Sequence, residues 1–390
     1  MKNLLQINCT ANWGSTGKIA EQIGRKAAER GWDSYLAYGR YVNPSQLKLI
    51  RVGSAINPYL HYAEQRIRDN EGQCSRLATR RLIKQIEDIK PDVIQLHNIH
   101  DHFLNYPLLF SYLNQTDIKV VWTFHDCWAF TGHCYHFVTQ NCDRWKTGCH
   151  DCPLKDNLLD GSQQNWELKK SLFSVNRNLT IVACSQWMAD FVRESFLGNK
   201  PTSVIHNGID LNVFRPEVIG VPQNKGFHIL AVSNVWSRDK GIDDIYLLRK
   251  MLSPEFVITV VGLSKAQVQS LPEGIIGIQR TQNVRELVWL YNSADVLINP
   301  TYADTFPTVN LESLACGIPV VTYRTGGSPE AIDEATGVVV QQGDINALAD
   351  AIKRLKDTPL SREACRKRAE LLFDKDRCFS QYIDLYESIL

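Results

Sequence analysis

The chain of 390 residues has no long apolar run, no short-period repeat and no low-complexity tract. A membrane-spanning helix needs roughly 20 consecutive apolar residues, and no segment approaches that length. The formal net charge is only +1, so no bulk electrostatic field favours nucleic acid or an anionic surface as a partner. These absences, together with 44% hydrophobic and 22% charged residues, indicate a globular protein.

The N-terminus also lacks the character of an export signal. The opening Met-Lys-Asn-Leu-Leu-Gln-Ile-Asn-Cys turns polar too soon for the apolar core of a signal peptide, and it resembles a first β-strand. We therefore expect a cytoplasmic protein in which the eleven cysteines are reduced.

Short buried strands alternate with helical patterns along the whole chain, which is typical of βαβ units and parallel sheets. Because the length exceeds one ordinary core, we expect two domains. The predicted fold class is α/β, with two doubly wound Rossmann-like domains. The predicted strands are 4–8, 34–38, 91–97, 119–125, 179–183 and 203–205, then 227–232, 256–261, 275–278, 296–299 and 319–322.

A segment with the composition of a linker, 214–226, separates the two series of strands. We place an N-terminal domain at 1–217, with a cysteine-rich insertion at 127–153, and a C-terminal domain at 218–374. Residues 375–390 are predicted to form an amphipathic helix.

The segment 303–321 is predicted to form a loop, a short helix and a buried strand, with Gly317 ending the helix. Thr305 is the expected cap and Pro307 suits the first turn. The backbone N–H groups of Thr308 and Val309 would then be donors for a phosphate.

Two carboxylates frame this helix start. Glu312 can accept hydrogen bonds from a vicinal diol such as ribose, and Asp304 in the loop can bind hydroxyls of a sugar. The alternative is an ordinary helix whose two acids face solvent.

The glycine turn before the first long helix is not a P-loop. Position 12 is Asn where that motif has Gly, and position 19 is Ile where it has Ser or Thr. His97 and His125 end predicted strands, and His100 follows one; we favour hydrogen-bonding or sugar-binding roles for them over metal ligation.

Several segments in order resemble the family-4 retaining glycosyltransferases of the GT-B fold, including bacterial exopolysaccharide and colanic-acid-type enzymes. The resemblance covers nearly the whole chain. It is carried by Asp304 and Glu312 with 315–321 (Ala-Cys-Gly-Ile-Pro-Val-Val), by 207–210 (Asn-Gly-Ile-Asp) with Phe214 and Pro216, by Lys240-Gly241, and by 325–330 (Thr-Gly-Gly-Ser-Pro-Glu).

The resemblance implies two domains facing a central cleft and a last helix, 375–390, that crosses back onto the first domain. It implies that His125, Asp304 and Lys240 are catalytic, with His125 near the reacting carbon and Lys240 on the donor diphosphate. The implied donor-binding residues are Gly17, Arg238, Lys240, Phe306, Thr308, Val309 and Glu312.

Three positions depart from the family pattern. Asp304 replaces the usual Glu, Pro307 stands where Gly is frequent, and Val235 replaces an Arg for which Arg238 is a nearby substitute. These departures affect how the transferred sugar is bound more than they affect the fold.

The resemblance thus implies a retaining hexosyltransferase that moves a sugar from a UDP- or GDP-sugar to a glycan or lipid-linked acceptor in polysaccharide biosynthesis. No cofactor is expected for catalysis and no nucleic acid as partner; peripheral contact with the inner face of the membrane is left open. The alternatives are a GT-B nucleotide-sugar epimerase or phosphorylase, and a non-catalytic nucleotide-sugar-binding protein.

Nearly half of the cysteines fall in the insertion at 127–153. Four of them, Cys134, Cys142, Cys149 and Cys152, make a candidate structural zinc site, with His133, His136 or His150 as substitute ligands. The alternative is a loop with free or partly oxidised thiols.

Overall fold

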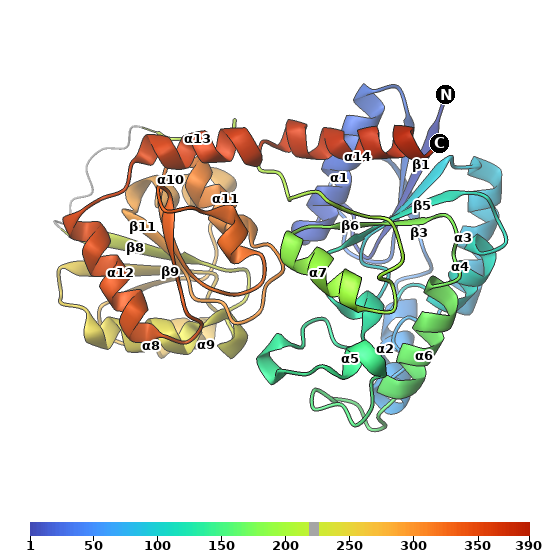
Figure 1. Cartoon of the computed structure of the whole chain (residues 1–390), viewed down its shortest axis with the longest axis horizontal. Helices are drawn as coiled ribbons and strands as arrows, with labels where there is room; N and C mark the ends of the chain where they lie inside the picture. The colour runs from blue at the N-terminus through green and yellow to red at the C-terminus, as the bar shows by residue number, and fades with distance from the viewer. Residues whose placement is uncertain (218–225) are drawn as a thin grey trace. The chain divides into compact units, whose positions relative to one another are not determined.

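The computed structural model describes residues 1–217 and 226–390 and divides the chain into two compact units (Figure 1). The first unit comprises Met1–His206 and Asp376–Leu390, and the second comprises Asn207–Lys375. The first unit thus ends earlier than the boundary we predicted after residue 217. Asn207 explains the difference, because its side-chain amide donates to the carbonyl of Phe306 at 3.2 Å. The rest of the predicted linker, 218–225, lies outside the described residues.

The first unit is built on a seven-stranded parallel sheet of order β3-β2-β1-β4-β5-β6-β7. Its central strands are buried along their length, as expected for parallel strands covered by helices on both faces. The strands are β1 (Asn3–Asn8), β2 (Asp33–Tyr38), β3 (Lys48–Arg51), β4 (Val93–Leu96), β5 (Lys119–Phe124), β6 (Leu179–Ala183) and β7 (Thr202–Val204).

Helices cover both faces of this sheet (Figure 1). The largest core cluster packs strand residues such as Trp122 and Phe124 against Phe110 and Phe173 from two of the helices. The helices are α1 (Gly14–Glu29), α2 (Asn57–Arg68), α3 (Arg76–Ile89), α4 (Tyr106–Leu113), α5 (Arg144–Thr147), α6 (Ser162–Phe173), α7 (Gln186–Glu194) and α14 (Lys375–Ile389).

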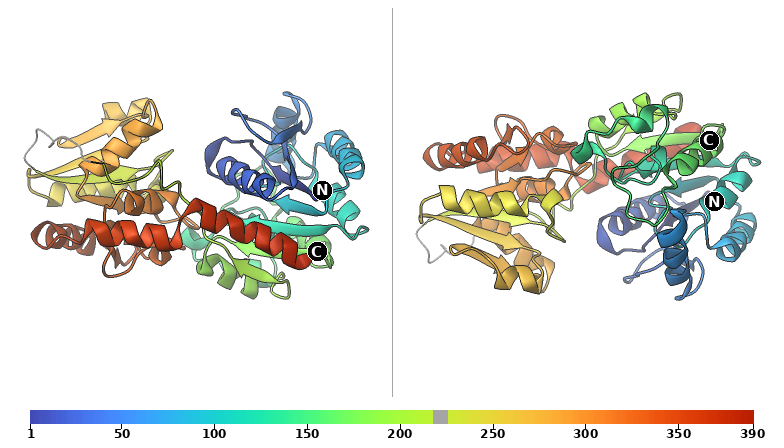
Figure 2. Two further views of the ribbon diagram at one scale, coloured as in Figure 1. Left: turned by 90° about the horizontal axis from the view of Figure 1, so that it is seen from above. Right: turned by 90° about the horizontal axis from the view of Figure 1, so that it is seen from below.

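The C-terminal helix α14 belongs to the core of the first unit and lies beside α1 (Figures 1 and 2). Four side chains of this helix, Phe379, Tyr382, Ile383 and Tyr386, are at most 3% exposed and join one core cluster. The Tyr386 hydroxyl donates to Gln95 Oε1 at 2.9 Å. The first unit is therefore made from both ends of the chain.

The second unit repeats the design with a six-stranded parallel sheet of order β10-β9-β8-β11-β12-β13. Its strands are β8 (Phe227–Val232), β9 (Phe256–Val261), β10 (Ile275–Ile278), β11 (Val296–Asn299), β12 (Val320–Tyr323) and β13 (Gly337–Val340). Its helices are α8 (Ile242–Met251), α9 (Lys265–Gln269), α10 (Val284–Ser293), α11 (Thr308–Ala315), α12 (Ile345–Asp357) and α13 (Arg362–Leu372).

The predicted α/β class with two doubly wound sheets is confirmed. Strands β3 and β13, both at sheet edges, were not predicted. The apolar segment 103–110 is part of the core, since Phe103, Leu104 and Phe110 are almost completely buried.

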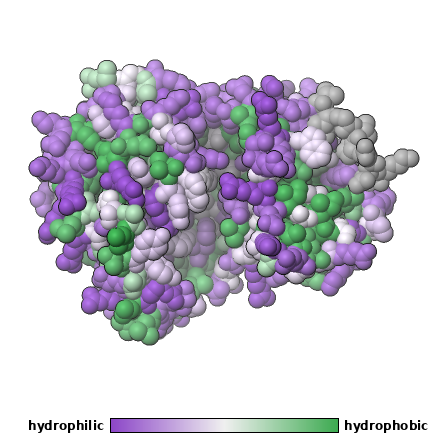
Figure 3. All heavy atoms as spheres, turned by 180° about the vertical axis from the view of Figure 1, so that it is seen from behind, coloured by the Kyte–Doolittle hydropathy of each residue, from purple (hydrophilic) through white to green (hydrophobic). Residues whose placement is uncertain are grey.

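In the described residues, no helix has the length and apolar character needed to cross a bilayer. The space-filling view shows apolar side chains in separate patches among polar ones (Figure 3).

Candidate active site

Each sheet reverses its strand order at one point, between β1 and β4 in the first unit and between β8 and β11 in the second. In open parallel sheets, ligands bind beyond the carboxyl ends of the strands at such switch points. The loops after these four strands carry several of the predicted site residues.

In the second unit, Lys240 and Asp304 meet. Lys240 ends the short 3-10 helix Arg238–Lys240 in the connection that follows β8, and Asp304 lies in the loop after β11. The Lys240 ammonium donates to Asp304 Oδ2 at 2.7 Å and to the Ala303 carbonyl at 3.0 Å. Both side chains keep part of their surface exposed, 33% for Lys240 and 24% for Asp304. A cation and a carboxylate are thus held together where a polar ligand can reach both.

Two glycines allow these loops to approach each other closely. Gly241, at φ +78°, lies against the Pro300 carbonyl, and Gly326, at φ +54°, lies against the Asp304 carbonyl. A Cβ atom would come within 2.1 Å and 1.7 Å of those oxygens, so no other residue fits without backbone movement. The positions of Lys240 and Asp304 therefore depend on glycines that follow them in the chain.

Helix α11 begins at Thr308, and its cap is Pro307 rather than Thr305, which corrects our prediction. Proline disfavours the helical conformation in the residue before it, so the helix cannot include Phe306. Pro307 lacks an N–H but supplies the carbonyl that accepts from the Asn310 N–H at 3.3 Å. Among the described residues, the N–H groups of Thr308 and Val309 have no hydrogen-bond acceptor.

Glu312, on the second turn of α11, is held by a residue that we did not predict. The hydroxyl of Tyr291, on α10, donates to Glu312 Oε2 at 2.7 Å. Burial of the Tyr291 phenol and the adjacent carboxylate raise its pKa far above the ordinary value, so it is a hydrogen-bond donor at neutral pH. No sequence signal distinguishes Tyr291 from an ordinary apolar position of its helix.

Two other predicted donor-binding residues lie differently. The Arg238 side chain is 93% exposed, and its ion pair with Asp243 spans 3.9 Å. Phe306 is 3% exposed and packs on Phe373 with ring centroids 5.9 Å apart. Phe306 therefore supports the loop from within, whereas Arg238 is not brought to Lys240 or Asp304.

In the first unit, His125 follows β5 and is linked to His97 after β4. Gln6 Nε2 donates to the Ala20 carbonyl, so Gln6 Oε1 faces His97 and accepts from its Nε2–H at 3.1 Å. His97 Nδ1 must then accept from His125 Nε2–H, also at 3.1 Å. This chain of hydrogen bonds leaves His125 Nδ1 without a proton.

Both imidazoles are neutral. Burial, the largest cause, lowers the pKa of His125 to about 4 and that of His97 well below its ordinary value. The adjacent pair behaves differently: His100 Nε2 lies 2.9 Å from Asp126 Oδ2. Burial, the largest single cause, lowers the His100 pKa, but Asp126 together with Glu71 and Asp101 raises it by more, so the pKa lies above its ordinary value.

Gly17 lies in the first unit on α1, packed against the β1–α1 turn. A Cβ there would lie 2.6 Å from Thr10 Oγ1, and its φ is not of the left-handed kind, so the glycine serves close packing. That is a structural reason for Gly17 in addition to the donor contact we predicted.

The cysteine-rich insertion at 127–153 also belongs to the first unit. Cys134, Cys142, Cys149 and Cys152 all line one small hollow, and His133 lies beside Cys152. Of the substitute ligands considered, His150 has a side chain 55% exposed and pairs with Asp151.

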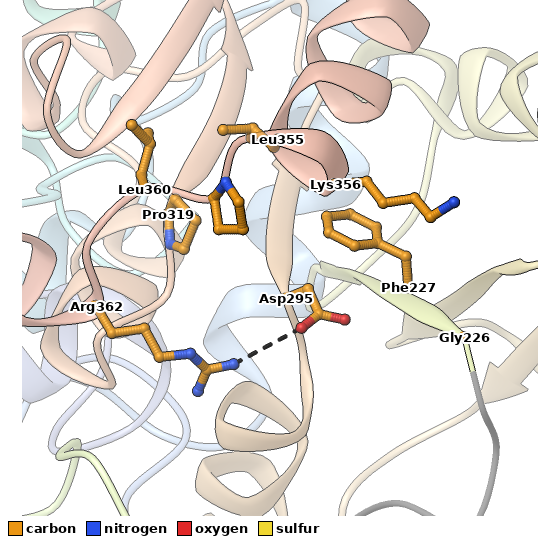
Figure 4. A pocket seen from close by; sticks show the side chains of 9 residues that line it. Gly226, Phe227, Asp295, Pro319, Leu355, Lys356, Leu360 and Arg362 are labelled. Atoms are coloured by element: carbon orange, nitrogen blue, oxygen red, sulfur yellow. Dashed lines mark ion pairs between the residues drawn. The ribbon is translucent and has the colours of Figure 1, made fainter.

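A larger hollow, of about 320 Å³, lies in the second unit (Figure 4). Its lining includes Gly226, Asp295 and Pro319, which precede β8, β11 and β12, and Arg362 pairs there with Asp295 at 3.9 Å. It therefore lies at the amino ends of the strands, opposite the edge that carries Lys240 and Asp304.

Two Rossmann-like domains of parallel strands, with these polar residues at the carboxyl edges, match the GT-B glycosyltransferase architecture. Among solved structures, sucrose-phosphate synthase from Thermosynechococcus elongatus superposes with a TM-score of 0.76 at 18% identity, covering 100% of this chain and 99% of that one. Anabaena Alr3699/HepE in complex with UDP follows with a TM-score of 0.67 at 15% identity, covering all of both chains.

The chain belongs to Glycosyltransferase Family 4, whose profile matches residues 16–213. A second profile, Glycosyl transferases group 1, matches residues 219–371. The chain is 24% identical to the Escherichia coli (strain K12) protein named "Putative colanic acid biosynthesis glycosyl transferase WcaC", over 99% of this chain and all of that protein. It is 22% identical to N-acetyl-alpha-D-glucosaminyl L-malate synthase of Bacillus anthracis, over 100% of this chain and 98% of that protein.

Proposed function

We propose that this glycosyltransferase is a retaining enzyme that moves a hexosyl group from a nucleoside diphosphate sugar to a glycan or lipid-linked acceptor in polysaccharide biosynthesis. The observation that carries the proposal is the ion pair between Lys240, in the connection after β8, and Asp304, in the loop that leads into the N-terminus of α11, where no side chain caps the helix. The likeness to a colanic acid biosynthesis protein supports the polysaccharide setting.

The second unit would bind the donor. Lys240 and the N–H groups of Thr308 and Val309 supply positive charge and donors for the diphosphate. Glu312, fixed by Tyr291, accepts from the ribose hydroxyls. Asp304 accepts from hydroxyls of the transferred sugar. The Arg238 side chain is exposed to solvent and would have to turn toward the donor to bind it.

The first unit would supply His125 at the transferred sugar. With a pKa of about 4 its ring is neutral, so it offers hydrogen bonds and adds no positive charge next to a cation-like transition state. The bond between the anomeric carbon and the diphosphate oxygen breaks, and the leaving oxygen takes the proton of the acceptor hydroxyl as the new bond forms on the same face. That course retains the configuration and needs neither a protein nucleophile nor a metal ion.

A uridine donor is the first to test, because HepE is described in complexes with UDP and with UDP-glucose. The use of a guanosine diphosphate sugar as donor remains a prediction. A cytoplasmic location also stays a prediction.

Contact with a membrane surface is part of the proposal. Helix α2 carries Tyr59, Leu60 and Ile67, all more than half exposed, together with Arg66 and Arg68, which pair with Asp156 and Glu64. Apolar and basic side chains on one helix suit an anionic bilayer interface. Sedimentation with vesicles containing anionic lipid, compared with neutral vesicles, tests this contact.

The central experiment screens UDP-, GDP- and ADP-sugars by thermal shift and then assays transfer with each donor that binds. NMR of the product's anomeric proton should show the configuration of the donor. Inverted product would contradict the retaining course. Conversion of the nucleotide sugar to a different sugar, with no acceptor present, would instead support the epimerase alternative.

The Glu312→Ala variant separates an enzyme from a nucleotide-sugar-binding protein without activity. We expect donor binding to fall by about 10- to 100-fold, since a hydrogen bond to a charged group contributes about 1.5–3 kcal/mol. Transfer should fall with it. Transfer unchanged in this variant would favour a non-catalytic role for the predicted site.

A further inference from the structure

Two cysteines and a histidine of the insertion meet in the first unit. Cys134 Sγ and Cys152 Sγ are 3.6 Å apart, and His133 Nε2 is 3.0 Å from Cys152 Sγ. These three ligand atoms all lie within 4.8 Å of one another. His133 and Cys134 lie on one turn and Cys152 on another, and the rest of the insertion connects the two turns.

His133 is oriented by a buried carboxylate. Its Nδ1 donates to Oδ2 of Asp69, a residue only 1% exposed, at 2.6 Å. The hydrogen bond fixes the ring so that Nε2 points at the sulfur. A carboxylate behind a histidine, with the other nitrogen turned to a metal, is the arrangement that holds metal-binding histidines in proteins.

A small hollow lies beside these sulfur atoms; Cys142 lines it together with Cys134, Cys149 and Cys152, whereas His133 does not. The hollow has about 20 Å³ of free space, little more than the 10–15 Å³ or so that one water needs. Cys149 also lines it, three residues before Cys152, and its Sγ accepts from the Gly132 N–H at 3.2 Å. Cys149 therefore comes from the same C-x-x-C turn as Cys152.

The distances among His133, Cys134 and Cys152 fit a tetrahedral ion, whereas Cys149 Sγ is not within 4.8 Å of all three ligand atoms and would have to turn toward them. Two sulfur atoms at about 2.3 Å from zinc are about 3.8 Å apart, and a sulfur and a nitrogen are about 3.5 Å apart. The sulfur pair is within about 0.2 Å of this spacing, and the histidine needs to move by about half an ångström. Three thiolates and an imidazole favour a soft or borderline cation such as zinc over calcium or magnesium.

We propose that Cys134, Cys149, Cys152 and His133 bind one zinc ion that ties the insertion at 127–153 to Asp69. Each thiol loses its proton to solvent as its sulfur coordinates the metal. The set differs from the four cysteines expected from the sequence, because His133 replaces Cys142.

The contacts of Asp69 indicate which segments the ion would hold in place. Its side chain, at the end of α2, also accepts from the Gly161 N–H at 2.9 Å and from Asn157 Nδ2 at 2.6 Å. The same segment donates from Leu158 to the Arg66 carbonyl at 3.0 Å. Through His133 and Asp69, the ion would fasten the insertion and the segment 157–161 to α2.

A buried lysine nearby can balance the charge; burial lowers its pKa to about 7, and neighbouring thiolates favour its charged form. Three thiolates outweigh the charge of one Zn²⁺ by one. The Lys169 ammonium, 1% exposed, donates to the carbonyls of Trp128, Thr131 and Gly132 and so lies against the turn that carries His133. It lowers the electrostatic cost of gathering thiolates in the interior.

The test measures metal in the full-length chain, purified under reducing conditions without a histidine tag. Mass spectrometry of the elements should find about one zinc per chain. Cys152→Ser, Cys134→Ser and His133→Asn should each lose most of it. The matched controls, Cys142→Ser and Cys74→Ser, should keep it; Cys74 lies outside the cluster and bonds Asn70.

A second measurement holds even if a variant fails to fold. Wild-type protein is stripped with a chelator, checked by circular dichroism and titrated with Co²⁺. One equivalent should give the visible bands of tetrahedral cobalt and the near-ultraviolet absorption of thiolate ligands. Limited proteolysis of the stripped protein should then cut within 127–161 faster than before, and zinc should reverse the change.

Three outcomes would overturn the proposal. The first is wild-type protein with neither zinc nor a tetrahedral cobalt spectrum. The second is a Cys134–Cys152 disulfide that persists under reducing preparation. The third is loss of metal in Cys142→Ser with retention in His133→Asn, which would assign the fourth ligand to Cys142.

Discussion

At the scale of residues, the Asp304 carboxylate beside Lys240 weakens the binding of a diphosphate in two ways. The Asp304 carboxylate neutralises the cation that a diphosphate needs, and it also adds negative charge beside the diphosphate. Asp304 therefore needs a role other than binding the diphosphate. We propose that it binds hydroxyls of the transferred sugar.

Asp304→Asn should therefore separate nucleotide binding from turnover. We expect the free nucleoside diphosphate to bind as tightly as to wild type or more tightly, while kcat for transfer falls by at least about 10-fold, the loss of about 1.4 kcal/mol of transition-state stabilisation. Calorimetry and initial rates measure the two effects. Asp304→Glu, which restores the usual family residue, serves as the control and should recover part of kcat. Equal losses in binding and rate would contradict the division of roles.

Tyr291 is a positioning residue, so its removal should have a smaller effect than removal of Glu312. Tyr291→Phe removes the hydrogen bond to Glu312 Oε2, and we expect donor affinity to fall by about 3- to 10-fold, the equivalent of an ordinary hydrogen bond of about 0.5–1.5 kcal/mol. Tyr302→Phe is the matched control, because its hydroxyl donates to Asp244 instead. Isothermal titration with nucleotide compares them; equal effects of the two variants would argue against a special role for Tyr291.

His125 should make stability depend on pH. Burial lowers its folded-state pKa to about 4, below the ordinary 6.5, although Asp126 partly opposes the shift. Between pH 6.5 and 4 the unfolded chain binds more protons at this position, so stability is complete above pH 6.5 and falls as the pH falls through that window. The shift corresponds to about 3 kcal/mol at most.

Urea unfolding of wild type and His125→Asn at pH 7, 6 and 5 tests this dependence. The free energy of unfolding should decline less steeply with falling pH in the variant. His61, whose pKa burial also lowers to about 4, remains in both proteins and contributes equally. Parallel pH profiles would show that His125 does not titrate as argued.

At the scale of elements, the sequence was informative where strands are long and apolar. Largely apolar strands such as β8 and β9 were predicted with their bounds, because parallel strands inside a sheet covered by helices are mostly apolar. Strand β3 has only exposed or half-buried residues and gave no such signal. The helix cap at Pro307 was missed because it depends on backbone torsion rather than on a capping side chain.

The same limit applies to the site. Lys240, Asp304 and Glu312 could be chosen because their motifs are local in sequence. Tyr291, Asp69 and the hydrogen bonds from Gln6 to His125 could not, because each partner lies on a different element and only the fold brings them together.

The turn after β12 gives a prediction at this scale. Gly326→Ala should destabilise the second unit by several kcal/mol, because its Cβ would lie 1.7 Å from the Asp304 carbonyl oxygen and φ is +54°. Gly31→Ala is the control: φ is +80° but nothing lies within 4 Å, so only the left-handed strain of about 1–2 kcal/mol remains. Thermal unfolding measures both, and equal losses would mean that the clash relaxes freely.

At the scale of the whole molecule, the two units differ in how the chain builds them. The second unit is continuous from Asn207 to Lys375, whereas the first needs Asp376–Leu390 to return to it. The four apolar side chains of α14 are buried almost completely, and each contributes about 1.5–3 kcal/mol. Together they approach the entire stability of an ordinary domain, about 5–15 kcal/mol.

A chain that ends at Lys375 should therefore lose the cooperative unfolding of the first unit and keep that of the second. Calorimetry should show the loss of one transition, and a nucleotide that binds the second unit should still raise the remaining one. Arg30→Ala in the full chain is the control: it removes the ion pair with Asp384 at 2.7 Å, and a surface pair of this kind is worth about 0–1 kcal/mol. If the truncated chain kept both transitions, the burial of α14 would contribute far less than its side chains suggest. If Arg30→Ala were as damaging as truncation, ion pairs rather than apolar burial would hold α14 in place.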